Sequence, residues 1–402
     1  MIQVYQKPLI GKNIGVVLGA FAPLHQGHLD QIMRAKKEND GCLVIVCGGN
    51  PDRGDAVGLP FKRRYRYVRE FFANDDLVAV YGINDTEEGV PDYPNGWGRW
   101  LEVFFDIALQ NTEHPETTRS NAAFPKYVFY VGEPEYAEAL EKKGHNVVLL
   151  DRTKNPISAT IIRKEPLKYW NKIALPFRRA FSHNILITGT ASEGKSTLAK
   201  DLGKYFSAPA SYEWARNYMA ESGVNDNELD SSDYFAFLYG QYNLNKQMIN
   251  SPANRGVFFA DTDAMTTLMY AEHYANDPTC ILTVDEAEKI RTAAIELTRK
   301  SRWDKIFVVV PHGPFVDDHT RYMLHASINE RELLFKRLKN ILSDCGYNTY
   351  GKNFIYANNS SPGNQRLITF QPEAREDVVF LDGTYYENFL TIKKYVEELG
   401  YE

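Results

Sequence analysis

Short, continuous apolar runs recur along the chain, and each is followed by a turn and a segment with helical periodicity. The run at 14–18 leads through a glycine-containing turn into a periodic stretch that starts at Leu29. The run at 185–188 leads in the same way into 196–202. A short apolar strand, a glycine turn and a helix are typical of a parallel sheet that is buried on both faces. The pattern therefore predicts two α/β domains.

Further strands are predicted from the remaining apolar runs. They lie at residues 43–46, 77–80, 127–131, 147–150, 257–260, 306–310 and 353–355. Strands that alternate with helix-length segments indicate βαβ units. We expect domains at 1–168 and 183–402, joined by a connector at 169–182 in a stretch rich in basic residues, and a helix over 385–399.

Composition and charge exclude several classes of protein. The apolar fraction is 44% and the charged fraction is 24%, which is usual for a globular protein. The net charge of -6 provides no global positive field for nucleic acid or an acidic membrane. Four scattered cysteines without CxxC spacing exclude a zinc ribbon and a disulfide framework. No apolar run is long enough for a signal peptide or a membrane span, so we expect a soluble, cytoplasmic protein.

The strongest local motif is the sequence GAFAPLHQGH at 19–28, directly after the first predicted strand. Its glycines and proline form a turn that brings His25 and His28 to the carboxyl end of a strand, where α/β sheets bind ligands. The start of the following helix adds free N–H groups suited to phosphate. The histidines can donate hydrogen bonds to phosphate oxygens. Alternatively, both histidines could have a purely structural role. Their position in one shared turn disfavours that alternative.

A second candidate phosphate site is the sequence ISATIIR at 157–163. Ser158 is a natural N-cap, Thr160 adds a hydroxyl in the first turn, and Arg163 follows one turn later. Taken alone, the pattern is equally consistent with simple helix capping. Together with the two histidines it favours a phosphate site.

These motifs resemble the nucleotidylyltransferase superfamily, whose members join the α-phosphate of ATP to a phosphate acceptor and release pyrophosphate. The segment 87–100 further resembles the NadR type, whose acceptor is nicotinamide mononucleotide. Aromatic residues there suit a cationic pyridinium, although they could also be core residues that close a loop. The resemblance implies ATP contacts from Gly19, Phe21, His25, His28, Gly132, Ser158, Thr160 and Arg163. It implies acceptor contacts from Arg64, Tyr93, Asn95 and Trp97.

The basic stretch at 62–66 has more than one interpretation. Arg64 or Arg66 could reach the triphosphate, as the Arg-x-Arg of the family does. The same charges could equally form a solvated helix face.

The second half of the chain contains the sequence GTASEGKST at 189–197, which matches the P-loop pattern GxxxxGK[ST] between a predicted strand and a helix. Backbone amides of such a loop surround the phosphates, Lys195 is expected to reach the β- and γ-phosphates, and Ser196 to bind Mg²⁺. The expected ATP-binding residues are Gly189, Glu193, Gly194, Lys195, Ser196 and Thr197.

Acidic residues follow the neighbouring predicted strands. Glu213 is the leading candidate for a base that takes a proton from a ribose hydroxyl, with Asp261 as a magnesium ligand and Asp263 as a substrate contact. These three roles could permute. The region also resembles the ribosylnicotinamide kinase domain of the NadR type. That resemblance implies a catalytic lid arginine at Arg321 and nicotinamide riboside contacts from Tyr212, Glu213, Arg216, Tyr242 and Asp263; either tyrosine could instead belong to the core.

The sequence thus predicts a Rossmann-like nucleotidylyltransferase domain followed by a P-loop kinase α/β domain, both with parallel sheets. The kinase would convert nicotinamide riboside to nicotinamide mononucleotide, and the first domain would convert that product to NAD, with Mg²⁺ and ATP. A riboflavin kinase joined to an FAD synthetase fits poorly, because that kinase has no P-loop. Two alternatives stay open: a nucleotide-sensing regulator, and a kinase and adenylyltransferase that act on another nucleoside.

The expected partners are small molecules. About a dozen residues precede the first strand, too few for the helix-turn-helix repressor module that some members of the family carry. We therefore expect no nucleic-acid and no membrane partner, and leave a homo-oligomer open.

Overall fold

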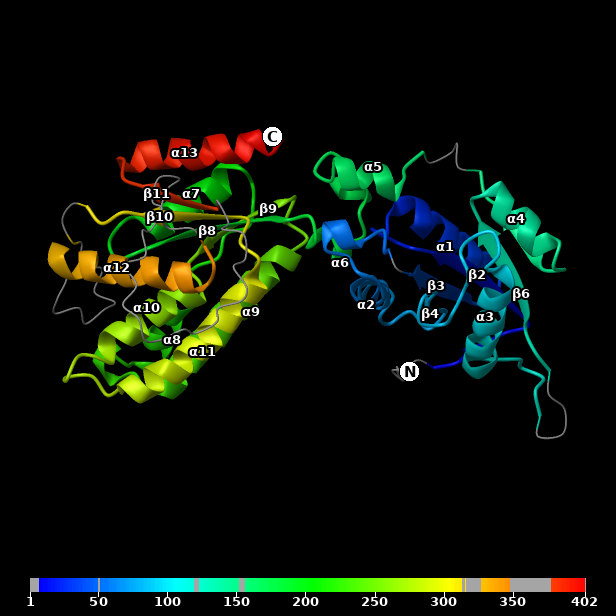
Figure 1. Cartoon of the computed structure of the whole chain (residues 1–402), viewed down its shortest axis with the longest axis horizontal. Helices are drawn as coiled ribbons and strands as arrows, with labels where there is room; N and C mark the ends of the chain where they lie inside the picture. The colour runs from blue at the N-terminus through cyan, green and yellow to red at the C-terminus, as the bar shows by residue number, and fades with distance from the viewer. Residues whose placement is uncertain are drawn as a thin grey trace, which may run out of the picture. The chain divides into compact units, whose positions relative to one another are not determined.

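The computed structural model describes residues 7–49, 51–118, 123–151, 156–312, 315, 327–347 and 377–401. The chain divides into two compact units, Met1–Phe181 and Ser182–Glu402 (Figure 1). Each unit is an α/β fold around a parallel sheet, which confirms the predicted fold class. Within the described part of the chain, no helix is long and apolar enough to cross a membrane.

The first unit is built on a five-stranded parallel sheet. Its strands are β2 (Asn13–Gly19), β3 (Cys42–Gly48), β4 (Val78–Asn84), β6 (Lys126–Val131) and β7 (Asn146–Leu149), and they confirm the predicted runs. The spatial order is β4-β3-β2-β6-β7, so the chain runs outward from β2 to one edge and then crosses to β6 on the other side. The order reverses between β2 and β6, and an open α/β sheet binds ligands at such a switch point.

Helices cover both faces of this sheet because successive side chains of a strand point to opposite faces. Val17 of β2 packs in a core with α1 (Gln26–Glu38) and α2 (Phe61–Phe71). Val16, one residue earlier, packs in a second core with α3 (Trp97–Asn111) and α4 (Pro134–Glu141). The unit is completed by short elements: β1 (Leu9–Ile10), β5 (Thr112–Glu113), η1 (Asp55–Val57), α5 (Ala159–Lys164), η3 (Trp170–Lys172) and α6 (Leu175–Arg178).

We expected residues 169–182 to be a connector. Residues 169–181 instead pack into the first unit, which ends at Phe181. Trp170, Ile173 and Phe177 are buried in the same core as Val17. The ring of Phe177 meets Tyr67 of α2 edge-on at 5.4 Å. The basic residues of this stretch suggested an exposed linker, but its apolar residues recur at spacings of three and four and bury one face.

The second unit is built on a parallel sheet with the order β11-β10-β8-β9. Its strands are β8 (His183–Gly189), β9 (Val257–Asp261), β10 (Lys305–Val309) and β11 (Val378–Leu381). A single parallel bridge from Ala210 to Phe259 extends the sheet beyond β9, directly before the segment that carries Glu213. The predicted strand at 353–355 lies outside the described residues, and β11 was not predicted.

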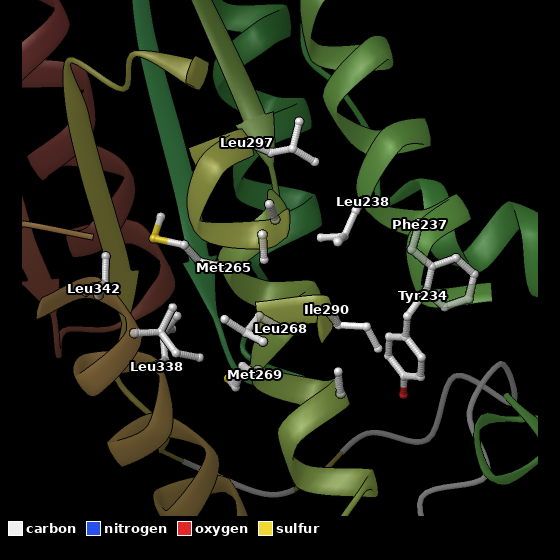
Figure 2. Packing of buried hydrophobic residues seen from close by; sticks show 14 of the residues in the cluster. Tyr234, Phe237, Leu238, Met265, Leu268, Met269, Ile290, Leu297, Leu338 and Leu342 are labelled. Carbon is white, nitrogen blue, oxygen red and sulfur yellow. The ribbon is translucent and has the colours of Figure 1, made fainter. Parts of the chain in front are cut away.

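Helices of the second unit also lie on both faces of its sheet (Figure 1). Leu186 of β8 belongs to a large apolar core, part of which Figure 2 shows. The helices of that core are α8 (Trp214–Ser222), α9 (Ser231–Asn250), α10 (Ala264–Tyr274), α11 (Val284–Ser301) and α12 (Ile328–Asp344). The opposite face is covered by α7 (Lys195–Tyr205) and α13 (Tyr385–Glu398), and α13 confirms the helix expected over 385–399. A short turn of 3-10 helix, η4 (Asp226–Glu228), precedes α9.

One glycine inside α9 is required by packing. A Cβ atom built on Gly240 would lie 2.4 Å from the indole of Trp214, which is too close for any real contact. Trp214 begins α8, so the missing side chain at Gly240 allows α8 to lie against α9.

We predict that Gly240→Ala destabilises the protein by about 1–3 kcal/mol, because the added methyl group overpacks this contact. Replacing an exposed helical glycine with alanine normally raises the stability of a protein by about 1 kcal/mol. Gly98 of α3 has open space around it, so Gly98→Ala is the matched control. Differential scanning calorimetry should give a lower transition temperature for the first variant and an unchanged or higher one for the second. Equal behaviour of the two variants would contradict the steric explanation.

Candidate functional sites

A large cleft opens in the first unit at the carboxyl ends of β2 and β6, with a volume of about 1340 Å³. It lies at the switch point of the sheet, where the fold predicts a ligand site. The lining includes nearly every residue expected from the sequence: Gly19, Phe21, His25, His28, Arg64, Tyr93, Trp97, Gly132, Ser158, Thr160 and Arg163. Asn95 is the exception, since it is exposed and does not line the cleft.

The two histidines are held as a pair. His25 is the N-cap of α1, and its Nδ1 accepts a hydrogen bond of 3.2 Å from the backbone N–H of Gly27. In the neutral ring an accepting Nδ1 leaves the proton on Nε2, which makes Nε2 a donor. The His25 and His28 ring centroids are 3.9 Å apart, and Phe21 packs edge-on against His28 at 4.9 Å. The arrangement suits donation to oxygens of a phosphate.

The second predicted element, around α5, is joined to the loop that carries the histidines. Arg163 donates from Nη1 to the carbonyl oxygen of Ala22 at 2.6 Å and from Nη2 to Thr160 Oγ1 at 3.1 Å. Ser158 caps α5 by accepting from the N–H of Ile161. Burial and the nearby Arg53 guanidinium lower the pKa of Arg163. Two guanidinium groups beside one cleft favour an anionic ligand, so capping and phosphate binding are compatible here.

Arg64 is almost fully buried, with 1% of its surface exposed, and it holds the walls of the cleft together. Its Nε donates to the carbonyl of Leu59 at 2.9 Å, and Nη1 donates to the carbonyls of Ala20 and of Cys47 at the end of β3. Its Nη2 forms an ion pair with Asp52. These bonds occupy most of its donors, which favours a role as a support for the loops. Arg66 is exposed and does not line the cleft.

We predict that Arg64→Met lowers the stability of the first unit by about 3–5 kcal/mol, because it leaves the Asp52 carboxylate and several carbonyls buried without a partner. Arg66→Met on the exposed face of the same helix should change stability by less than about 0.5 kcal/mol. Calorimetry of both variants distinguishes the support role from a ligand-binding role. A stable, folded Arg64→Met protein that has lost only substrate affinity would contradict this assignment.

The far end of the cleft is aromatic and acidic. Trp97 packs edge-on against Trp100 and Tyr136, with centroids 5.8 and 5.2 Å away, and Tyr93 lies 5.4 Å from Tyr136. Asp85 follows the last residue of β4, and burial together with the nearby Asp92 raises its pKa to about 6. The sequence reasoning missed Asp85, because the strand predicted at 77–80 ends four residues before β4 does.

In the second unit, the P-loop joins the end of β8 at Gly189 to the start of α7. Gly194 precedes α7 with φ of 74°, in the left-handed region that favours glycine. Lys195 is buried, and its Nζ donates to the carbonyl of Thr190 at 2.5 Å. Ser196 follows in the first turn of α7, and Thr197 next to it is exposed.

Glu193 in the P-loop has a supporting contact that the sequence did not reveal. Its side chain is 1% exposed, and Oε1 accepts from Arg331 Nη1 at 2.5 Å. Its Oε2 accepts from the backbone N–H of His312 at 3.2 Å. Arg331 is itself buried in α12. This ion pair fastens the P-loop to α12, so the side chain of Glu193 is directed into the protein.

Asp261 lies at the carboxyl end of β9, beside the P-loop. It is 3% exposed, and the nearby Ser196 side chain acts to lower the pKa of its carboxyl group. Burial raises the pKa of Asp261, the Lys195 ammonium partly opposes this, and the negative charge of Glu213 adds to it. The structure therefore brings together the lysine, hydroxyl and two carboxylates that were expected from separate parts of the sequence.

The side chain of Asp263, two residues later, forms hydrogen bonds within the protein. The chain turns at Thr262, which has φ of 101°, and Asp263 becomes the N-cap of α10. Its Oδ1 accepts from the N–H of Met265 at 3.0 Å, and its Oδ2 accepts from Trp303 Nε1 at 2.9 Å. Burial raises its pKa to about 6. With both oxygens engaged and 2% exposure, the geometry of Asp263 favours a structural role over the expected substrate contact.

The residues expected to bind the nucleoside come from the start of α8 and from α9. Tyr212 is exposed, and Arg216 Nε donates to Glu213 Oε2 at 2.7 Å. Tyr242 is half-buried, with Lys246 Nζ 5.2 Å from its ring centroid. Arg321 lies outside the described residues.

Gln241, a buried residue of α9, holds the backbone on both sides of Glu213. Its Oε1 accepts from the N–H of Trp214 at 2.8 Å, and its Nε2 donates to the carbonyl of Tyr212 at 3.1 Å. The position of Glu213 is therefore set by α9 as well as by its own helix.

Taken together, the two sites define a two-domain enzyme in which a nucleotidyltransferase unit precedes a P-loop kinase unit. Residues 16–165 match the family described as cytidylyltransferase-like, and residues 184–351 match the family described as AAA domain. The chain is 32% identical to a NadR protein solved in complex with NR, with a TM-score of 0.77 and coverage of 97% of this chain and 98% of the other. It is 33% identical to a NadR protein solved with NAD and AMP-PNP, again with a TM-score of 0.77 and 98% coverage of both chains.

Two curated relatives agree. The trifunctional NAD biosynthesis/regulator protein NadR of Salmonella typhimurium is 28% identical over 343 residues, which are 82% of this chain and 77% of the relative. The protein of the same name from Escherichia coli is 28% identical over 336 residues, 80% of this chain and 74% of the relative. The chain belongs to the NadR family.

Proposed function

We propose that the second unit phosphorylates nicotinamide riboside with ATP, and that the first unit transfers AMP from ATP to the resulting nicotinamide mononucleotide. The kinase reaction yields nicotinamide mononucleotide and ADP. The adenylyl transfer yields NAD and pyrophosphate. The supporting observation is that one chain carries two phosphate-type sites, each at the carboxyl edge of a parallel sheet, within a family whose solved members hold NR, NAD and AMP-PNP. The product of the second unit is the substrate of the first.

Adenylyl transfer in the first unit needs no covalent enzyme intermediate. A phosphate oxygen of the acceptor attacks the α-phosphorus of ATP, and the bond between the α-phosphorus and the α,β-bridging oxygen breaks to release pyrophosphate. We assign His25 and His28 to the reacting phosphate oxygens, whose charge grows in the transition state. Arg163 with Ser158 and Thr160 would hold the β- and γ-phosphates. Catalysis is then alignment and charge stabilisation by groups that the fold has already positioned.

Phosphoryl transfer in the second unit needs a base and a phosphate clamp. We assign Glu213 to the base that accepts the proton of the attacking ribose hydroxyl, and Lys195 to the β- and γ-phosphates of ATP. The Ser196 hydroxyl and the nearby buried Asp261 carboxylate are oxygen ligands of the kind that Mg²⁺ prefers. When bound, Mg²⁺ would neutralise phosphate charge at this place.

The cellular setting follows from composition. The four cysteines are free thiols, which fits a reducing compartment, and the net charge of -6 fits small-molecule substrates rather than nucleic acid. We therefore place the enzyme in the cytoplasm.

We predict that His28→Ala and Lys195→Ala separate the two activities, because each removes a phosphate contact from one unit only. Purified variants are incubated with Mg-ATP and nicotinamide riboside, and the products are separated by chromatography. His28→Ala should accumulate nicotinamide mononucleotide without NAD. Lys195→Ala should form no mononucleotide, yet should make NAD when the mononucleotide is supplied.

Two conservative controls accompany that test. His114→Ala lies outside the cleft, and Lys200→Ala alters an exposed residue of the same helix as Lys195. Both should retain both reactions. If wild-type protein formed no product from nicotinamide riboside, the kinase substrate would be another nucleoside, and if either variant lost both reactions while folded, the two sites would not be independent.

A second prediction concerns Glu213 and Asp263, two of the three carboxyl groups whose roles could permute on sequence alone. Glu213→Gln should lower the kcat of the kinase reaction by about 10²–10⁴-fold with little change in thermal stability, as expected when a general base is removed. Asp263→Asn should lower the unfolding temperature, because the amide cannot accept from both Met265 and Trp303, while the kcat of the folded fraction stays close to wild type. Kinetics and calorimetry of both variants check this, and the reverse pattern would exchange the two roles.

A further inference from the structure

The histidine turn at 19–28 accepts hydrogen bonds through alternate backbone carbonyls, and each donor comes from a distant part of the chain. The carbonyl and donor residues are Ala20 with Arg64, Ala22 with Arg163, and Leu24 with Ala174. In the third pair the donor is the backbone N–H of Ala174, 3.0 Å from the carbonyl oxygen of Leu24. Both residues are buried, so this bond is shielded from water directly before His25.

Ala174 belongs to residues 170–179, which we call the strap. The strap also pairs with the next two residues of the turn. Ile173 and His25 form an antiparallel bridge, and Lys172 Nζ donates to Gln26 Oε1 at 2.7 Å. The strap therefore contacts three consecutive residues of the turn, with the histidine in the middle.

The far side of the strap is anchored on α2, beside which α6 lies (Figure 1). The Phe177 ring is buried against Tyr67 of α2. The guanidinium of Arg179 lies 3.8 Å from the centroid of the same tyrosine ring and forms an ion pair with Glu70. Because α2 also carries Arg64, one helix supports the turn both directly and through the strap.

The strap can act on the reaction only through the turn. Among the described residues that line the cleft, none belongs to the strap. The ring of His25 follows the backbone of the turn, because its Nδ1 accepts from the N–H of Gly27 at 3.2 Å. A shift of this backbone is thus a shift of the imidazole. Donors that stabilise a transition state must be accurately placed, and a displacement of about 1 Å can cost about 100-fold in rate.

We propose that the strap is a positioning element for adenylyl transfer, which holds His25 in the place where it donates to the reacting phosphates. This inference rests on the proposed adenylyl transfer, and it extends the catalytic apparatus of the first unit to residues that contact no substrate. Interactions that form mainly in the transition state determine kcat rather than KM. A displaced His25 should therefore lower kcat and leave substrate affinity nearly unchanged.

The first test removes the donor of the strap by Ala174→Pro. Ala174 has φ of -59°, which proline adopts, and the preceding Ile173 is extended, as a residue before proline prefers. The variant replaces the N–H with a ring carbon, so the Leu24 carbonyl loses its donor. With Mg-ATP and nicotinamide mononucleotide, kcat should fall by about 10–100-fold, while KM for each substrate changes by less than about threefold. Ala174→Gly keeps the N–H and should retain most of kcat.

A second variant loosens the strap at its far side. Arg179→Met removes the ion pair and the ring contact on α2 without altering any residue that touches the turn, and should lower kcat by about threefold to tenfold. This variant decides the question if calorimetry shows that Ala174→Pro does not fold. Lys168→Met is the matched control, because Lys168 is exposed just before the strap and forms a surface ion pair with Glu165. It should leave kcat unchanged.

The outcomes separate this inference from the function on which it rests. Wild-type protein that makes no NAD from supplied nicotinamide mononucleotide would overturn the adenylyl-transfer proposal, and this inference with it. If wild-type protein is active, a folded Ala174→Pro protein with the wild-type kcat would overturn this inference alone, because the strap would then serve stability only. The same result for Arg179→Met is decisive if it alone folds. The kinase reaction is measured in the same samples, and an equal loss there would also overturn the inference.

Discussion

Parallel strands that are buried on both faces leave only the strand ends for chemistry. In the first unit, alternate side chains of the strands enter two different apolar cores, and in the second unit consecutive residues of β8 are fully buried, so a polar side chain along these strands has a cost. The glycine turns that follow β2 and β8 are therefore the first places where the chain can present polar groups. The histidine turn and the P-loop both lie at this edge, and each is followed by a helix whose free N–H groups favour phosphate.

Buried charges next to these turns hold the loops of the two sites together. Arg64 ties three loops of the first cleft together through backbone carbonyls and Asp52. Glu193 fastens the P-loop to α12 through Arg331. Both pairs are almost fully buried, so each partner depends on the other to remain charged in a region of low dielectric. Rigid phosphate sites follow from this, because loops alone would not hold the donors in one geometry.

The division of roles between acidic residues depends on where each strand ends. Asp261 and Asp263 would share one face if β9 continued, because side chains two apart in a strand point the same way. The strand ends at Asp261, and the backbone turns at Thr262, so Asp263 caps α10 and binds Trp303, forty residues further along the chain. Sequence reasoning named both carboxylates but left their roles open, because it could not tell where β9 ends.

The sequence by itself determined the two α/β units, most of their strands, the two histidines and the P-loop, because these features depend on local periodicity and on residues that are adjacent in the chain. It did not reveal the core position of 169–181, the strand β11, or the supporting roles of Arg64, Glu193 and Asp263. Those features, and the position of Asp85 in the cleft of the first unit, were decided by the tertiary structure. A buried donor or acceptor acquires its role from partners that are distant in sequence, and only folding brings those partners within hydrogen-bond distance.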